Sequence, residues 1–179
     1  MFEDRVLLIT GGTGSFGNAV LRRFLTSDLR EIRIFSRDEK KQDDMRKKYA
    51  HPKLKFYIGD VRDPRAVASA MRGVNYCFHA AALKQVPAAE YNPFEFIKTN
   101  VIGAENVINA AIDRRVKHVV ALSTDKAANP INLYGATKLC AEKLCLAYSK
   151  LHGIEAVCLR YFNVFGVRQR FDAYGNVIP

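Results

Sequence analysis

The stretch RVLLITGGTGSFG, from Arg5 to Gly17, decides the fold. It begins as a short apolar run and ends in a series of glycines that leads into the helical pattern of Phe16–Leu25. Glycines let a strand-to-helix turn approach a pyrophosphate closely, and the following helix points its N-terminal amides at the negative charge. The stretch therefore predicts a βα unit that binds a dinucleotide, with incidental glycines in a tight turn as the alternative. The expected loop contacts are Gly11, Gly14, Ser15, Phe16 and Gly17.

Strand-like and helix-like segments alternate along the rest of the chain. Further strands are expected at Ile32–Ser36, Leu54–Ile58, Tyr76–Ala80, Val119–Ser123 and Glu155–Tyr161. Helices are expected at Asp38–Tyr49, from near Pro64, at Asn92–Arg115 and at Leu133–Leu151. This alternation predicts an α/β fold, a Rossmann-like doubly wound parallel sheet with helices on both faces. Residues 1–179 are expected to form one NAD(P)-binding domain.

Length and composition suit one globular domain. The chain has 179 residues, of which 49% are hydrophobic and 26% charged. No apolar run is long enough to cross a membrane, and the first residues lead almost directly into a strand, which leaves no room for a signal peptide. We therefore expect a cytoplasmic protein with no membrane partner.

The charge and the cysteines narrow the choice of ligands. A net charge of +10 permits an anionic partner, but the basic residues are scattered and form no block interleaved with aromatics. This pattern favours a nucleotide ligand over a nucleic acid. Cys77, Cys140, Cys145 and Cys158 form no CxxC pair, so buried reduced thiols are expected and no metal site is.

Residues at the ends of the next strands indicate which dinucleotide binds. The second strand ends in Ser36-Arg37, with Lys41 close behind, and a guanidinium and a hydroxyl suit the 2′-phosphate of NADP better than the 2′-hydroxyl of NAD. The alternative is that Arg37 is an ordinary solvated loop residue. Asp60, followed by Val61, either accepts a bond from the adenine amino group or caps the helix near Pro64. The small residues of the fourth strand's end would let a cofactor lie against the backbone; they are Ala80, Ala81 and Ala82.

Tyr134 and Lys138 lie four residues apart on a predicted helix and therefore share a face. An ammonium beside a phenol favours the phenolate, which would make Tyr134 a usable base near neutral pH. Lys138 could also bond to a nicotinamide ribose. Alone, such a pair is common on helices, but here it accompanies a glycine loop.

The combined motifs resemble a known superfamily. T-G-x-x-G-x-x-G from Thr10, Y-x-x-x-K at Tyr134, and Asn100 in a long helix are similar to the extended short-chain dehydrogenase/reductases. Within that superfamily, GDVRD (59–63), HAAALKQVP (79–87) and LSTDKAANPINLYGATK (122–138) resemble the inverting UDP-N-acetylglucosamine 4,6-dehydratases of pseudaminic acid and capsule synthesis.

The resemblance implies roles for an acid–base pair just upstream of Tyr134. In such enzymes the sugar is oxidised at C4 by NADP while Tyr134 takes the hydroxyl proton. Asp125 would then act as a protonated acid at the C6 hydroxyl and Lys126, deprotonated through burial, as the base at C5. A turn in which Asp125 caps and Lys126 is solvated is the alternative.

Further roles also follow from the resemblance alone. Thr124 would contact the C4 oxygen, and Lys84 and Asn163 would contact the nucleotide sugar. Asn100 would bond within its own helix, hold the surroundings of Lys138 and belong to the cofactor site. The long helices would join copies of the chain in a homo-oligomer.

The resemblance weakens at the C-terminal edge. RYFNVFGVRQ, residues 160–169, looks more like the UDP-sugar 4-epimerases, which have no use for an Asp–Lys pair. Superfamily members also continue into a substrate domain that is largely absent from this chain. Three functions therefore stay open: a 4,6-dehydratase or its cofactor-binding part, a UDP-sugar 4-epimerase, and a non-catalytic dinucleotide-binding domain.

Overall fold

The structure is a computed structural model that describes residues 2–162, and its six strands form one parallel sheet. The strands are β1 (Val6–Thr10), β2 (Glu31–Ser36), β3 (Leu54–Ile58), β4 (Tyr76–His79), β5 (His118–Thr124) and β6 (Glu155–Tyr161). Their order across the sheet is β3-β2-β1-β4-β5-β6. The order reverses between β1 and β4, and ligands of such sheets bind outside the carboxyl ends of the strands at that point.

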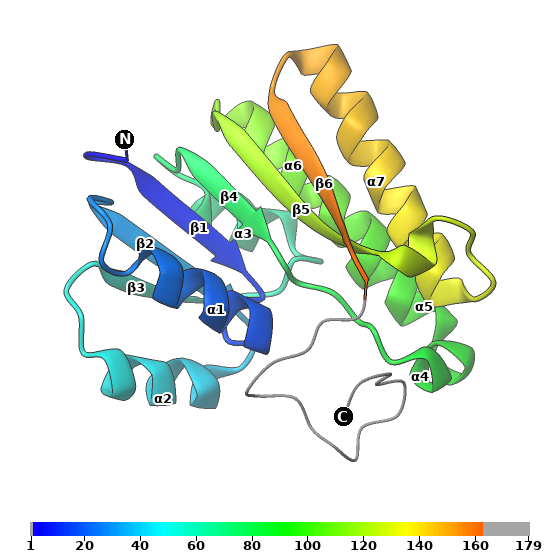
Figure 1. The fold of residues 1–179 in the computed structure, drawn as a ribbon, viewed down its shortest axis with the longest axis horizontal. Helices are drawn as coiled ribbons and strands as arrows, with labels where there is room; N and C mark the ends of the chain where they lie inside the picture. Colours follow the sequence, from blue (N-terminus) through cyan, green and yellow to red (C-terminus); the bar gives the residue numbers. More distant parts are fainter. Residues whose placement is uncertain (1, 163–179) are drawn as a thin grey trace.

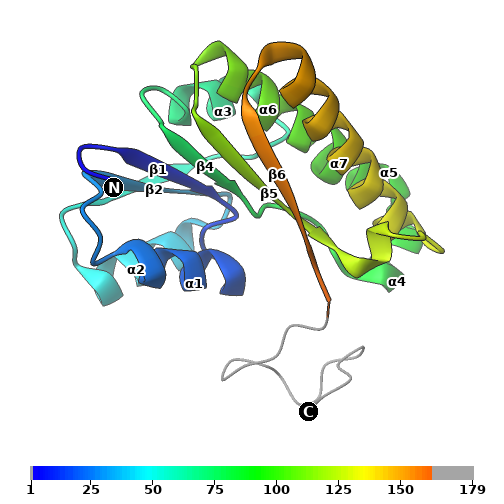
Figure 2. The same ribbon diagram turned by 45° about the horizontal axis from the view of Figure 1, so that its top comes forward.

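Helices cover both faces of this sheet. They are α1 (Ser15–Phe24), α2 (Glu39–Tyr49), α3 (Pro64–Ala70), α4 (Val86–Tyr91), α5 (Pro93–Phe96), α6 (Gly103–Asp113) and α7 (Leu133–His152), with a π-helical turn η1 (Ile97–Ile102) and a 3-10 turn η2 (Asp125–Ala127). In Figures 1 and 2, α1 and α2 lie on one face while α3, α6 and α7 lie on the other. The predicted doubly wound α/β fold is confirmed.

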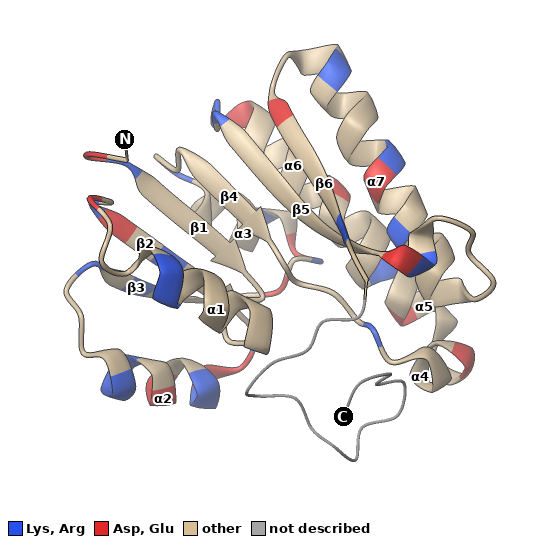
Figure 3. Cartoon of the chain, in the orientation of Figure 1, with Lys and Arg blue, Asp and Glu red and all other residues tan. Residues whose placement is uncertain are grey.

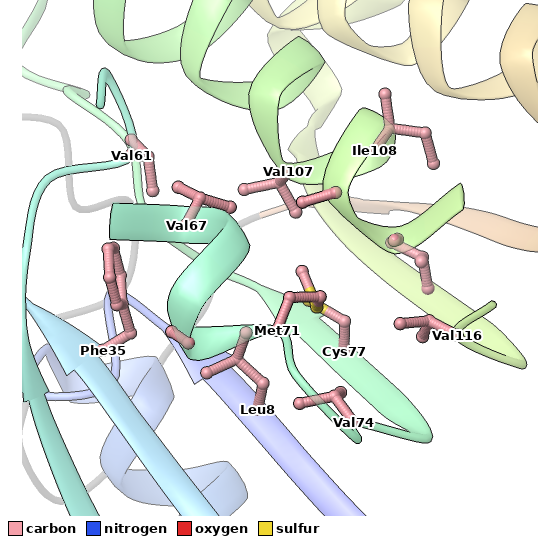
Figure 4. Close-up of a cluster of buried hydrophobic side chains, with 14 of the residues drawn as sticks. Leu8, Phe35, Val61, Val67, Met71, Val74, Cys77, Val107, Ile108 and Val116 are labelled. Carbon is pink, nitrogen blue, oxygen red and sulfur yellow. The ribbon is translucent and has the colours of Figure 1, made fainter. Parts of the chain in front are cut away.

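The core consists of one apolar layer on each face of the sheet. β1 is buried at every position, and its successive side chains point to opposite faces. Leu8 lies in one buried cluster with Met71, which directly follows α3, and Val107 of α6 (Figure 4), while Ile9 lies in the other with Leu21 of α1. Because side chains pack on both faces of β1, its carboxyl end and the glycines that follow it are held in place.

The region between β4 and β5 differs from the expected single helix over 92–115. The chain forms α5, then the π-helical turn η1, then α6, and it ends at Asp113 rather than Arg115. Residues 86–91 form α4, which the sequence analysis did not predict. A π turn inserts an extra residue into a helix without a distinctive composition, so spacing alone does not reveal it.

The four cysteines are free thiols, but they are not all buried. Cys77 and Cys145 are buried, Cys158 is partly buried and Cys140 is exposed. The expectation is therefore wrong for Cys140, which lies on the solvent side of α7 together with Ala136 and Lys143.

Basic residues are spread over several helices rather than gathered on one face, as Figure 3 shows. On α2 two lysines pair with acids one turn away, Lys40 with Asp44 at 2.7 Å and Lys47 with Asp43 at 2.6 Å. No helix within residues 2–162 combines the length and the apolar character that a membrane span requires.

Candidate functional site

The loop between β1 and α1 is shaped by contacts that exclude side chains. A Cβ on Gly17 would lie 2.5 Å from Gly12 Cα, and a Cβ on Gly11 would lie 2.7 Å from the backbone N of Ala81. Gly11 also has a φ of +65°, which glycine adopts readily. Gly14 precedes the first turn of α1, so the exposed Ser15 and the half-buried Phe16 begin a helix whose amides face the loop. This cradle fits a pyrophosphate, and it places Ala81 against the same loop.

The ends of β2 and β3 lie side by side. Arg37 is exposed, and its guanidinium lies 3.4 Å from Asp60 Oδ2. Ser36 is buried and its hydroxyl accepts a bond from Gln42, so it is not free to face a ligand in this structure. Lys41 pairs with Asp38, the residue that caps α2.

Asp60 is not a helix cap, since Asp63 caps α3 instead. Burial raises the pKa of Asp60, but bonds from Arg62 outweigh this and hold it below its usual range. Asp60 is therefore an ionised acceptor beside Arg37. Val61, expected at the cofactor, points its side chain into the core, where it packs under Gly103.

The turn η2 joins the end of β5 to the start of α7. Asn132 caps α7 by accepting a bond from Gly135 N at 2.9 Å. Gly135 packs directly on the carbonyl of Lys126, too closely for any side chain at that position. The structure thus holds Asp125 and Lys126 against the helical turn that carries Tyr134.

Asp125 is an ionised carboxylate in this structure. It accepts bonds from Thr124 Oγ1 at 2.8 Å and from the backbone N of Lys126 at 2.9 Å. The Thr124 bond, with the charge of Lys126, lowers the pKa of Asp125 despite its partial desolvation. The expectation of a protonated Asp125 is wrong here because these donors favour the charged form. Lys126 was expected to be buried, yet its side chain is 48% exposed.

Tyr134 and Lys138 share a face of α7 but are not coupled as expected. Burial raises the pKa of Tyr134, with a side-chain contact to Thr124 opposing and Asp125 adding to the rise. Lys138 is 5% exposed, its Nζ donates to the carbonyl of Leu122, and burial lowers its pKa. The predicted lowering of the Tyr134 pKa by Lys138 is therefore not seen, because the ammonium is directed at β5.

Asn100 bonds outside its own helix, contrary to expectation. From η1 its side chain accepts from Leu83 N at 2.8 Å and donates to Leu83 O at 2.9 Å and Thr137 Oγ1 at 3.0 Å. It therefore ties the loop after β4, which carries the exposed Lys84, to the helix that carries Tyr134.

Several residues of this region were missed by the sequence analysis. His79 is buried, its Nδ1 lies 2.7 Å from Thr10 Oγ1, and burial lowers its pKa to about 3. A small cavity beside Lys138 is lined by His79, Glu142, Cys145 and Cys158. Glu142 follows Lys138 by four residues, and that spacing was the one signal that could have found it.

Two further expectations concern Asn163 and the absence of a metal site. Asn163 lies outside the described residues. Across residues 2–162, no group of three or more His, Cys, Asp or Glu side chains could hold a metal ion.

Comparison with known proteins places this arrangement in a family. Residues 7–179 match the family model described as polysaccharide biosynthesis protein. The chain belongs to this family. Curated relatives named UDP-glucose 4-epimerase include those of Rickettsia akari, 58% identical, and Rickettsia prowazekii, 56% identical. Each matches all of this chain and 53% of the relative, so the chain spans about half the length of these relatives.

Solved structures agree with this membership. Pen from Bacillus thuringiensis is 40% identical with a TM-score of 0.85, over 90% of this chain and 50% of that one. The dTDP-glucose 4,6-dehydratase DesIV from Streptomyces venezuelae, solved with NAD, is 26% identical with a TM-score of 0.79, over 87% of this chain and 54% of that one. These relatives confirm the resemblance to the extended short-chain dehydrogenase/reductase superfamily.

Proposed function

We propose that this chain is the cofactor-binding part of a nucleotide-sugar enzyme that oxidises a UDP-hexose at C4 and later reduces the intermediate. The observation that carries the proposal is the packing of Gly135 on Lys126, which holds the η2 turn beside Tyr134 at the carboxyl edge of the sheet. The glycine loop reaches that same edge from β1. The names of the family's members support a nucleotide sugar as substrate.

A nicotinamide dinucleotide fits the residues of this edge. Its phosphates would lie on the cradle of Gly11, Gly14 and Gly17, its adenosine near Asp60, and its ribose near Lys138. When bound, it supplies reversible oxidation of a sugar carbon. We favour NADP because Arg37 is exposed and adjacent to the adenosine side of the site. NAD is the alternative, supported by the relative solved with NAD.

Within this site Tyr134 accepts the proton of the C4 hydroxyl. Burial and the charge of Asp125 raise the pKa of Tyr134, so its role as a base requires a cation near the phenol in the substrate-bound enzyme. Lys138 is the cation on the same helical face, and Thr124 is the hydroxyl at the end of β5 that orients the C4 oxygen. Lys84 and Asn163 are our proposed contacts to the nucleotide sugar.

Two outcomes can follow C4 oxidation. The name of the curated relatives reported above favours a UDP-sugar 4-epimerase, in which the 4-keto intermediate is reduced again with inverted configuration at C4. The Asp125–Lys126 pair favours a UDP-N-acetylglucosamine 4,6-dehydratase, since an epimerase needs neither group. In a dehydratase, Asp125 must gain a proton that its present bonds to Thr124 and Lys126 disfavour.

Product analysis in heavy water separates these outcomes. The purified chain is incubated with NADP+ or NAD+ and with UDP-glucose or UDP-N-acetylglucosamine, and the sugars are followed by NMR and mass spectrometry. An epimerase changes C4 without loss of mass or uptake of deuterium, whereas a dehydratase loses one water and gains deuterium at C5. An unchanged sugar with folded, cofactor-loaded protein would favour the non-catalytic dinucleotide-binding domain.

Self-association is a separate part of the proposal. Large apolar side chains are exposed on the helices expected to join copies, with Phe94 58% exposed, Ile102 39% and Leu146 48%. Contact through α5, η1, α6 and α7 would cover them. Analytical ultracentrifugation should show a dimer or larger species, and a monomer at all concentrations would contradict this part.

A further inference from the structure

Glu142 is a buried carboxylate that the proposed chemistry does not use. Its side chain is 6% exposed, and it accepts bonds from Arg160 Nε at 2.9 Å and from Arg160 Nη2 at 2.6 Å. Such a forked pair fixes the carboxylate in place and keeps it charged. Accordingly, the Arg160 bond helps lower the pKa of Glu142 although burial opposes this.

Arg160 is well placed to hold Glu142 because β6 pairs with β5 beside the site. The register sets Arg160 opposite Ser123, one residue before Thr124. Its guanidinium crosses from the edge strand to α7, and its side chain remains 42% exposed. The strand that borders the site thus anchors the acid on the helix that carries Tyr134.

Lys138 is the buried cation whose charged form a nearby carboxylate would stabilise. It lies one helical turn before Glu142, and both side chains line the same small cavity. Its ammonium donates to the carbonyl of Leu122, a neutral partner that cannot balance a buried positive charge. The other titratable groups of the cavity are His79 from β4, Cys145 from α7 and Cys158 from β6, and Glu142 is its carboxylate.

We propose that Glu142, fixed by Arg160, is the positioning residue that keeps Lys138 charged and aligned beneath the cofactor and substrate. The inference rests on the proposed function for the role of Lys138 in the reaction. The protonation state of Lys138 can be measured on this chain without sugar or cofactor. Burial lowers the pKa of Lys138, and the negative charge of Glu142 opposes that change. Removing the Glu142 charge should therefore lower the pKa of Lys138 further.

The test is a titration of Lys138 by NMR. The chain is labelled with ¹³C at lysine Cε, and the Lys138 signal is assigned by its loss in Lys138→Arg. In Glu142→Gln the titration of Lys138 should move to lower pH by about one unit. Glu142→Asp retains the charge and should recover most of the wild-type titration.

Two control variants separate charge from packing. Glu155→Gln removes a carboxylate from the far end of β6, where it pairs with His118 on the surface, and should leave the Lys138 titration unchanged. Arg160→Gln keeps the Glu142 carboxylate but removes the guanidinium that fixes it in the cavity, so Lys138 should titrate lower than in the wild type, by less than in Glu142→Gln. This variant also serves as the test if Glu142→Gln fails to fold.

The outcomes are distinct. An unchanged Lys138 titration in folded Glu142→Gln, or an unchanged or higher one in Arg160→Gln, overturns the inference. The titration needs neither sugar nor cofactor, so its result stands apart from the turnover assay. A shift in Glu142→Gln therefore supports the inference even where the sugars stay unchanged and the proposed function fails.

Discussion

The loop between β1 and α1 and the turn between β5 and α7 lie at the same edge of the sheet, but they are built differently. In the first, backbone meets backbone: Gly17 and Gly11 leave no room for a Cβ against Gly12 and Ala81. In the second, Gly135 also packs on the backbone of Lys126, but side chains set the charges around it: Thr124 bonds to Asp125, and Glu142 lines one cavity with Lys138.

The difference predicts how each region responds to change. Steric contacts between backbone atoms depend on residue size, so substitutions in the glycine loop should alter folding and cofactor binding together. The turn and α7 depend on charge and protonation, so substitutions there should alter chemistry while the fold persists. Four experiments probe this division, ordered by expected effect.

Tyr134→Phe should have the largest effect. Removing the hydroxyl that we propose takes the C4 proton should lower kcat by about 10²- to 10⁴-fold, because general acid–base groups contribute on that scale. Cofactor affinity, measured by fluorescence titration, should change little. Tyr148→Phe is the matched control on the same helix, since the Tyr148 hydroxyl bonds only to Glu105 in the described contacts. Equal losses in both variants would refute the assignment of Tyr134.

Gly17→Ala should lower both the folding stability of the protein and its affinity for the cofactor. The added methyl would lie 2.5 Å from Gly12 Cα, and forced overpacking of this kind costs about 1–3 kcal/mol of folding free energy. Chemical denaturation measures this loss, and cofactor affinity should fall with it. Gly14→Ala is the control for stability, because its Cβ would meet only Gly11 O at 3.2 Å. A Gly17→Ala protein as stable as Gly14→Ala would break the steric account of the loop.

Arg37→Ala tests whether the first region distinguishes NADP+ from NAD+. Loss of a charged bond to a 2′-phosphate costs about 1.5–3 kcal/mol, which corresponds to a roughly 10- to 100-fold weaker Kd for NADP+. The Kd for NAD+, which lacks this phosphate, should hardly change. Lys40→Ala removes a nearby cation that pairs with Asp44 and should affect neither Kd. Equal losses for both cofactors would mean that Arg37 does not read the 2′-phosphate.

His79→Gln should have the smallest effect, and it probes the place where the two regions meet. Burial depresses the pKa of His79 to about 3, below the ordinary value of 6.5 that applies to the unfolded chain. Below pH 6.5 the unfolded state therefore binds a proton that the folded state does not, so His79 destabilises the fold as pH falls by about 1.4 kcal/mol per pH unit.

The matching measurement compares the pH dependence of unfolding in three proteins. The difference between wild type and His79→Gln should shrink as pH falls from 6.5 toward 5, since the variant lacks this proton uptake. His152→Gln, at the exposed end of α7, serves as the control. Parallel stability curves for wild type and His79→Gln would contradict the burial of a neutral imidazole.

The same contrast explains what could be predicted from the sequence. Glycine spacing after an apolar run and alternating strands and helices are local patterns, and they led to the correct sheet and to the loop. The surroundings of Asn100 are not local: its side chain bonds to Leu83 and Thr137, which lie 17 and 37 residues away. Protonation depends on such contacts, so the ionised Asp125 and the Glu142–Arg160 pair could be read only from the folded chain.

Both proposed activities begin with oxidation of C4 of a UDP-sugar by the dinucleotide, with Tyr134 as the base. The most direct measurement is absorbance at the reduced-nicotinamide band after a UDP-sugar is mixed with excess chain loaded with NADP+ or NAD+. The account predicts a transient rise with the wild type and none with Tyr134→Phe. A flat trace and an unchanged sugar, with cofactor binding shown by calorimetry, would contradict it.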